Sequence, residues 1–291
     1  MGAYWFSGYV KRAKGPPEQE EWAVNQANFT KNRTGPLSYR QLDVKDFLIT
    51  PGRVRIDRKE RIETSSSPYA TAESYIKRGC TLLLTQHLVT SLRHYKVQYE
   101  QFLKKLRKLP VNFMVLPVVP VKLLRPEVIR FFSRKGSPFL CIRIKSREEL
   151  LDVCWEWIVQ AQSYRRMPLS LMVEEGRDAS NFYEELWSSL TRQYGMIKLT
   201  DIPDGEEVSV QNLRDSGIYP LRGDLLSGAS ADYNLYYRKS VQTFDDDDDF
   251  RYHDSVPDVT VMNGSVVQVQ QNIVPHTPGT HIKVKIHKHF V

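Results

Sequence analysis

The sequence predicts an α/β protein whose central part is a series of strand–helix repeats. Three observations support this fold class. Apolar runs typical of buried parallel strands alternate with amphipathic segments of helical spacing between residues 46 and 217. Turn residues and alternating apolar residues outside this region are typical of antiparallel strands. The repeats number about six, fewer than the eight of a closed (β/α) barrel, so we expect an incomplete barrel or one that residues 200–220 complete irregularly.

Composition indicates a folded protein with a substantial core. The chain has 291 residues, of which 41% are hydrophobic, enough for one large domain or two ordinary ones. Cys80, Cys141 and Cys154 lie in apolar segments without a CxxC pair, which predicts buried, reduced thiols. The N-terminus lacks a signal-peptide pattern and no apolar run is long enough to span a membrane. We therefore expect a cytoplasmic protein without a membrane span.

The net charge of +7 is the only feature that favours a nucleic-acid partner. Basic residues are spread along the whole chain, and their short clusters fall near the ends of expected helices, where cations are favourable. A small molecule or a protein is therefore the expected partner, and a nucleic-acid binder remains a further interpretation that rests on charge alone.

The first 45 residues predict a small β element. Residues 3–10 form an aromatic-rich run typical of a strand. The polar stretch that follows is broken by Gly15-Pro16-Pro17 and Gly35-Pro36, which are turn signals between short extended pieces.

A strand, a helix and a second strand are expected between residues 46 and 86. The first strand is the apolar run 46–52, the helix is 69–78, and the second strand is 80–86. This order predicts a crossover connection between parallel strands. The polar, arginine-rich segment between the first strand and the helix is interpreted as a loop.

The alternation continues to residue 199. Apolar side chains at three- and four-residue spacing predict the helices, and Gly136 and Gly195 are expected to end two of them. The expected strands are 111–121, 139–144, 167–173 and 196–199, and the expected helices are about 91–109, 125–136, 147–164 and 181–194.

Residues after 217 return to a β pattern. Strands are expected at 233–237, 259–262 and 266–269, with Asn263-Gly264 as a two-residue hairpin turn. Residues 282–287 alternate apolar and polar side chains, which predicts a strand with one exposed face. The acidic run 245–249 lacks the ligand spacing of a Ca²⁺ loop and is interpreted as a solvated loop.

Three motifs in this order resemble the amidohydrolase (metal-dependent hydrolase) superfamily. They are Thr50-Pro51-Gly52, the Gly- and Asp-rich stretch 217–232, and the hairpin segment 257–267. The resemblance implies a reduced or distorted TIM-type barrel at residues 46–217. It also implies a small β-sandwich built from residues 1–45 and 218–291. The implied activity is metal-dependent hydrolysis of carbon–nitrogen bonds other than peptide bonds.

The sequence departs from this family in the residues that bind metal. Counted from Thr50-Pro51-Gly52, the positions of the family's His-x-His pair fall on Asp57 and Lys59. Metal-dependent hydrolysis needs imidazoles and carboxylates that converge on the metal. We therefore expect a truncated, divergent member that has lost hydrolysis and serves as a binding or structural relative without a cofactor.

The alternative is an active hydrolase with a rebuilt site that holds Zn or Mn. Its candidate metal ligands are Asp57 and His87, and its candidate catalytic residues are Glu174 and Asp201. Glu174 follows an expected strand, where a barrel enzyme places its site. His87 and His94 follow the second expected strand and open the next helix. They are interpreted either as a pair that binds a metal or transfers a proton, or as polar residues that cap the helix.

The arginine-rich segment after residue 52 is a candidate ligand site. Arg53, Arg55 and Arg58 are expected at the mouth of the barrel, together with Lys59 and Arg61. Guanidinium groups form charge-assisted hydrogen bonds with anions. The segment is thus interpreted either as a site for an anionic ligand or as a basic loop.

Overall fold

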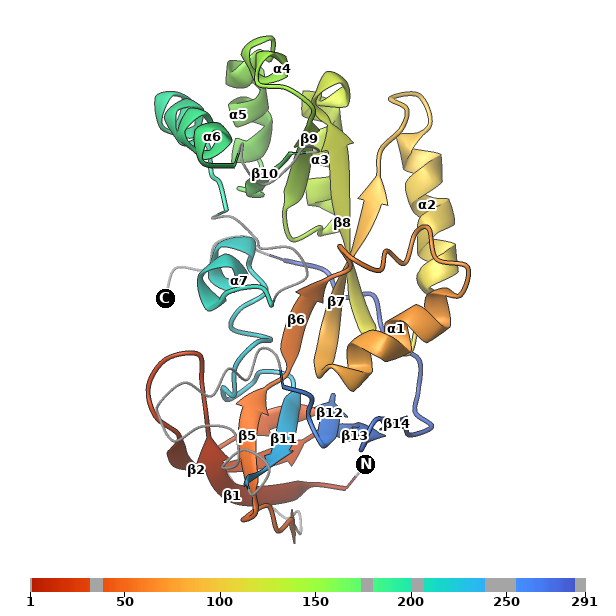
Figure 1. The fold of residues 1–291 in the computed structure, drawn as a ribbon, viewed down its shortest axis with the longest axis vertical. Helices are drawn as coiled ribbons and strands as arrows, with labels where there is room; N and C mark the ends of the chain where they lie inside the picture. Colours follow the sequence, from red (N-terminus) through yellow and green to blue (C-terminus); the bar gives the residue numbers. More distant parts are fainter. Residues whose placement is uncertain (1, 32–38, 174–179, 200–206, 239–254, 286–291) are drawn as a thin grey trace.

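The computed structural model describes residues 2–31, 39–173, 180–199, 207–238 and 255–285. These residues form a mixed α/β fold with two separate sheets, one above the other in Figure 1. One sheet is parallel, curled like half of a barrel and accompanied by helices. The described part contains no helix that is long and apolar enough to cross a membrane.

The first sheet has nine strands that come from both ends of the chain. Its main path runs β14-β13-β12-β11-β5-β1-β2-β3, and β4 pairs with β1. Strand β5 joins the two halves because it lies parallel to β1 and antiparallel to β11. The strands are β1 (Tyr4–Val10), β2 (Glu18–Asn25), β3 (Asn28–Thr30), β4 (Arg40–Gln41), β5 (Phe47–Pro51), β11 (Tyr233–Tyr237), β12 (Val259–Met262), β13 (Ser265–Val269) and β14 (Asn272–Ile273).

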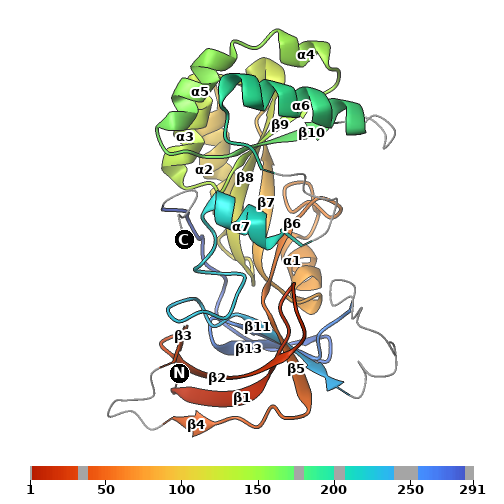
Figure 2. The same ribbon diagram turned by 90° about the vertical axis from the view of Figure 1, so that its left-hand side faces the viewer.

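The second sheet has five strands in chain order, β6-β7-β8-β9-β10, and all neighbours are parallel. Helices follow the strands as in repeated crossover units (Figure 2). The strands are β6 (Arg53–Ile56), β7 (Cys80–Leu88), β8 (Asn112–Pro120), β9 (Leu140–Ile144) and β10 (Leu169–Val173). The helices are α1 (Pro68–Lys77), α2 (Tyr95–Leu106), the short η1 (Val121–Leu123), α3 (Pro126–Lys135), α4 (Glu148–Leu151), α5 (Trp155–Ser163), α6 (Ser180–Tyr194) and α7 (Val210–Ser216).

Gly52 is the point where the chain passes from the first sheet to the second. Its amide donates to Asp232 O at 2.9 Å. A Cβ on Gly52 would lie 2.4 Å from Thr81 Oγ1, so no other residue fits without displacing a neighbour. A strand was expected at 46–52 and is present, but its assignment to the crossover unit was wrong. Its residues form β5 of the first sheet, and the strand of the crossover is β6.

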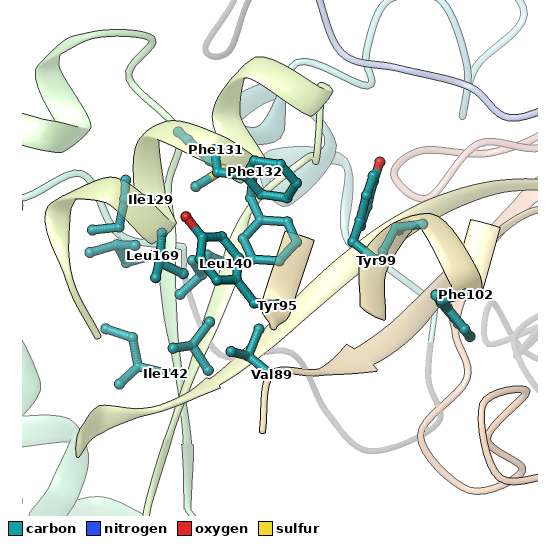
Figure 3. Packing of buried hydrophobic residues seen from close by; sticks show 14 of the residues in the cluster. Val89, Tyr95, Tyr99, Phe102, Ile129, Phe131, Phe132, Leu140, Ile142 and Leu169 are labelled. Carbon is teal, nitrogen blue, oxygen red and sulfur yellow. The ribbon is translucent and has the colours of Figure 1, made fainter. Parts of the chain in front are cut away.

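Alternate side chains of the parallel strands serve two hydrophobic clusters. On β7, Leu83 belongs to the outer cluster, which the helices cover, whereas Leu82 and Leu84 belong to the inner cluster. Figure 3 shows part of the outer cluster, where aromatic rings of α2 and α3 pack beside strand residues such as Leu140 and Ile142. This alternation fixes which side chains can reach the inside of the half-barrel.

The inner cluster is filled from the C-terminal part of the chain. Leu213 of α7, Ile218 and Tyr219 pack against the inner side chains of the strands. Val284 joins the same cluster, and its amide donates to Gly136 O at 2.9 Å. The concave side of the half-barrel is thus an apolar core that α7 and the C-terminal segment complete.

Both outer edges of the parallel sheet are partly paired. Lys198 forms a parallel bridge with Leu169 of β10, where the short strand 196–199 was expected. Glu207 forms an antiparallel bridge with Arg55 of β6, and Val208 N donates to Val54 O at 2.9 Å.

Three local predictions differ from the structure. The helix expected at 147–164 is interrupted, and α4 and α5 are separated around Cys154. Cys154 is exposed rather than buried, because it stands at the N-cap of α5 in this break. The strand expected at 282–287 is not formed by its described residues 282–285, although Ile282 N donates to Phe113 O at 2.8 Å and Val284 N donates to Gly136 O at 2.9 Å. Residues 286–291 lie outside the described part.

Candidate site at the ends of strands β6 and β7

Asp57 anchors the loop that follows β6. Its side chain is fully buried, and its two carboxyl oxygens accept different backbone amides. Oδ1 accepts from Gln86 N at 2.7 Å, and Oδ2 accepts from Ile62 N at 2.9 Å. Burial raises the pKa of Asp57 to about 8, although the two amide donors favour the charged form. The carboxyl group therefore binds the loop to strand β7.

Glu63 makes a second connection between the same loop and β7. Its Oε1 lies 2.8 Å from His87 Nδ1, and its Oε2 accepts from Leu88 N at 3.1 Å. Arg61 Nη2 lies 3.1 Å from Glu63 Oε2. Burial works against the charged carboxylate, but the hydrogen bonds from His87 and Leu88 N outweigh it and lower the pKa of Glu63.

His87 is buried between the loop and helix α2. Its ring stacks on Phe102 with 4.9 Å between centroids, and it meets the edge of Tyr99 at 6.3 Å. Figure 3 shows both aromatic residues on α2. Among the described residues, Nε2 of His87 is buried without a hydrogen-bond partner. The imidazole thus faces the helix layer rather than the concave side of the half-barrel.

Asp57 lies in the loop after β6, and His87 of β7 contacts the same loop through Glu63, but the described residues do not complete a metal site around them. Within the described ranges, no three His, Cys, Asp or Glu side chains are grouped as metal ligands. Glu174 and Asp201 lie outside the described residues. His94 is exposed at the N-cap of α2, and its side chain makes no capping hydrogen bond.

The concave side of the strands carries apolar side chains near the same ends. Ile56 of β6 and Val118 of β8 are buried in the inner cluster, and Leu88 at the end of β7 packs against it. These side chains have no atom that can ligate a metal ion. The described residues therefore do not fit the metal centre that the family resemblance implies.

The arginine cluster is placed differently from the prediction. Arg53 and Arg55 belong to strand β6 and are buried, so they do not lie in a loop at the barrel mouth. Arg53 Nη1 donates to Arg78 O at 2.9 Å, and Nη2 donates to Tyr236 Oη at 2.8 Å. Burial lowers the pKa of Arg55, and the neighbouring charge of Arg53 adds to this effect.

Arg58 alone of the three arginines follows the end of the strand, directly after Asp57, and its side chain is partly exposed. The alternation of apolar Val54 and Ile56 with Arg53 and Arg55 is the sequence signal that could have identified β6.

Glu63 is the residue of this site that the sequence did not single out. It lies in a polar loop, 24 residues before His87, and no motif connects the two positions. The parallel pairing of β6 with β7 brings them together.

Solved hydrolases have a similar fold. A D-hydantoinase aligns with a TM-score of 0.64 and 12% sequence identity, over 99% of this chain and 100% of that one. Dihydropyrimidinase from Brevibacillus agri NCHU1002 aligns with a TM-score of 0.59 and 10% sequence identity, over 99% of this chain and 100% of that one. A triazine hydrolase variant aligns with a TM-score of 0.54 and 12% sequence identity, over 94% of this chain and 96% of that one. These proteins are members of the amidohydrolase superfamily, and at such identities the likeness concerns the fold. No family model and no curated protein matches the sequence.

Proposed function

We propose that this protein is an amidohydrolase-like protein that has lost metal-dependent hydrolysis and acts as a binding or structural relative. Its architecture is then a reduced TIM-type barrel at residues 46–217 with a β-sandwich from residues 1–45 and 218–291. The position of Gly52 between β5 and β6 supports moving the boundary between the two domains to that residue.

The apolar concave side of the half-barrel carries this proposal. A catalytic metal in such a fold needs ligands that project from the strand ends into the barrel. Here Ile56 ends β6, and Leu88 and Val118 lie at or near the ends of β7 and β8, and all three belong to or pack against the inner cluster that includes Leu213 and Tyr219.

The polar residues near the strand ends already have structural partners. Both oxygens of Asp57 accept backbone amides of this chain, and Glu63 holds both Leu88 N and His87. A buried carboxyl group with two amide donors stabilises the loop that it anchors. These contacts support a scaffold role for the region. Arg58, partly exposed beside Asp57, remains the candidate for contact with an anionic ligand.

One observation favours the alternative, a divergent hydrolase of non-peptide carbon–nitrogen bonds. A metal-binding histidine commonly gives its other ring nitrogen to a carboxylate. His87 has this arrangement, because Nδ1 contacts Glu63 while Nε2 has no partner among the described residues. In this reading Asp57 and His87 hold Zn or Mn, and Glu174 or Asp201 supplies the catalytic carboxylate.

Metal content and hydrolysis distinguish the two functions. Untagged protein would be incubated with Zn²⁺ or Mn²⁺, freed of unbound metal and assayed by mass spectrometry. We expect less than one metal per chain and no hydrolysis of a hydantoin, a dihydropyrimidine or a triazine. One tightly bound metal that Asp57→Ala and His87→Ala both remove would overturn the proposal. His94→Ala is the matched control, because His94 is exposed and should not alter metal content in either case.

A further inference from the structure

Helices α4 and α5 carry an exposed apolar patch that the proposed function does not use. We define it by Leu151, Trp157 and Tyr164, whose exposed fractions are 57%, 63% and 57%. Trp157 has the highest exposed fraction among the large apolar residues of the described chain. Aromatic residues with such exposure are enriched where proteins contact each other.

The exposed face of α5 carries few charges, although Arg165 just beyond the helix lies over the Tyr164 ring, 5.9 Å from its centroid. Trp157, Gln160 and Tyr164 are exposed at spacings of three and four residues, so they lie on one side of the helix. Trp155 and Ile158 on the other side are buried. Glu156 is the only charged residue within α5. A solvated helix ordinarily carries many charges on this side, so the composition is typical of a contact surface.

A groove of about 570 Å³ opens beside Trp157. Its apolar lining includes Leu124 and Ile158, and Trp157 itself forms part of its wall. Four charged residues line it in equal numbers of each sign. They are Lys122, Arg125, Glu149 and Asp152. Lys122 Nζ lies 3.2 Å from Glu149, so part of this charge is already paired.

We propose that a second copy of this chain occupies the groove, in a two-fold symmetric dimer. Each copy inserts Trp157 into the groove of the other and packs α5 against the same helix of the second copy. A two-fold interface requires a surface that complements itself. Here a projecting indole stands beside a groove lined by apolar and charged residues. Because Lys122 and Glu149 already pair within each copy, Arg125 of one copy is left to meet Asp152 of the other.

The size of the contact surface limits the expected affinity of the dimer. Helix α5 has only nine residues, so the contact area is at the low end of specific interfaces. The dimer should therefore be weak and form as concentration rises. This inference goes beyond the proposed function and holds whether or not the chain hydrolyses a substrate.

Sedimentation velocity over a wide concentration range tests the proposal. We expect a monomer–dimer equilibrium for the full chain. Trp157→Ala should raise the dissociation constant by more than about tenfold, as for a central interface aromatic. Tyr69→Ala is the matched control, because Tyr69 is half exposed on α1, outside the patch, and its loss should leave the equilibrium unchanged. Far-ultraviolet circular dichroism verifies that both variants fold.

Cys154 provides a second measurement in the same groove. It is the exposed cysteine of the chain, whereas burial raises the pKa of Cys80 and Cys141 to about 12. A short bis-maleimide should therefore link two copies through Cys154, and Cys154→Ser and Trp157→Ala should each remove the product. A chain that stays monomeric at all concentrations, or a dimer that Trp157→Ala leaves intact, would overturn the proposal. Binding of an unrelated protein to a monomeric chain would do the same.

Discussion

Glu63 Oε1 lies 2.8 Å from His87 Nδ1, and this contact fastens the loop after β6 to the end of β7. Leu88 N donates to the same carboxylate. The first crossover connection of the parallel sheet is therefore held by a side-chain pair in addition to the strand pairing of β6 and β7.

Glu63→Gln should destabilise the protein at neutral pH and less so in acid. The folded structure lowers the pKa of Glu63. A lowered carboxyl pKa contributes stability above the unfolded value of 4.5, and this stability is lost as the pH falls through the folded value. We expect a loss of about 1–3 kcal/mol in the unfolding free energy at neutral pH.

Urea denaturation of wild type and Glu63→Gln at neutral pH and at about pH 4 measures this difference. The gap between the two proteins should narrow in acid. Equal losses at both pH values would show that the charge of Glu63 does not contribute.

Asp57 should have the opposite pH dependence. Its pKa is raised from 3.8 to about 8 because burial disfavours the charged carboxylate. The contribution of protonated Asp57 to the unfolding free energy is therefore fully present below pH 3.8, and it is lost as the pH rises through about 8. The unfolding free energy of wild type relative to Asp57→Asn should therefore fall across this window. Chemical denaturation of both proteins at about pH 5 and about pH 9 measures it, and a pH-independent difference would contradict the prediction.

Leu213→Ala should test whether the concave side is a packed core. Leu213 is buried in the inner cluster against strand residues of the half-barrel. Removal of a buried leucine side chain costs about 2–5 kcal/mol. Gln211→Ala on the same helix is the control, because Gln211 is exposed and its replacement should have little effect. A loss no larger than that of the control would indicate an open cleft at this position.

Gly279→Ala should be more damaging than most surface substitutions. A Cβ at this position would lie 1.9 Å from Val111 O, which is backbone and cannot rotate away. The Gly279 amide also donates to Leu109 O at 2.8 Å. We expect a loss above about 3 kcal/mol in thermal or urea unfolding. Gly2→Ala has open space around its Cβ and should be neutral; similar stability of the two variants would contradict the predicted clash.

Most strands of the parallel sheet could be predicted from the sequence because they are continuously apolar. Strands β7, β8, β9 and β10 lie where apolar runs were expected. Strand β6 was missed because its outward side chains, Arg53 and Arg55, are charged. The hydrogen-bond partners of Arg53 are Tyr236 of strand β11 and the carbonyl of Arg78 at the end of helix α1.

The candidate site was harder to predict than the fold. Asp57 and His87 were identified as candidates, but their roles depend on which backbone amides and which aromatic ring they meet. Glu63 carried no recognisable pattern. The break at Cys154 also had no Gly or Pro to indicate it. These features arise from tertiary contacts that residue spacing does not encode.

The position of β5 between β1 and β11 has a consequence for biosynthesis. The first sheet receives β5 early in translation, but β11 emerges only after the parallel strands have been made. Until then the β5 edge offers unpaired backbone groups to any neighbouring strand. A nascent chain of this protein therefore passes through a long period in which its exposed edge needs shielding, so chaperone supply during expression should govern its soluble yield.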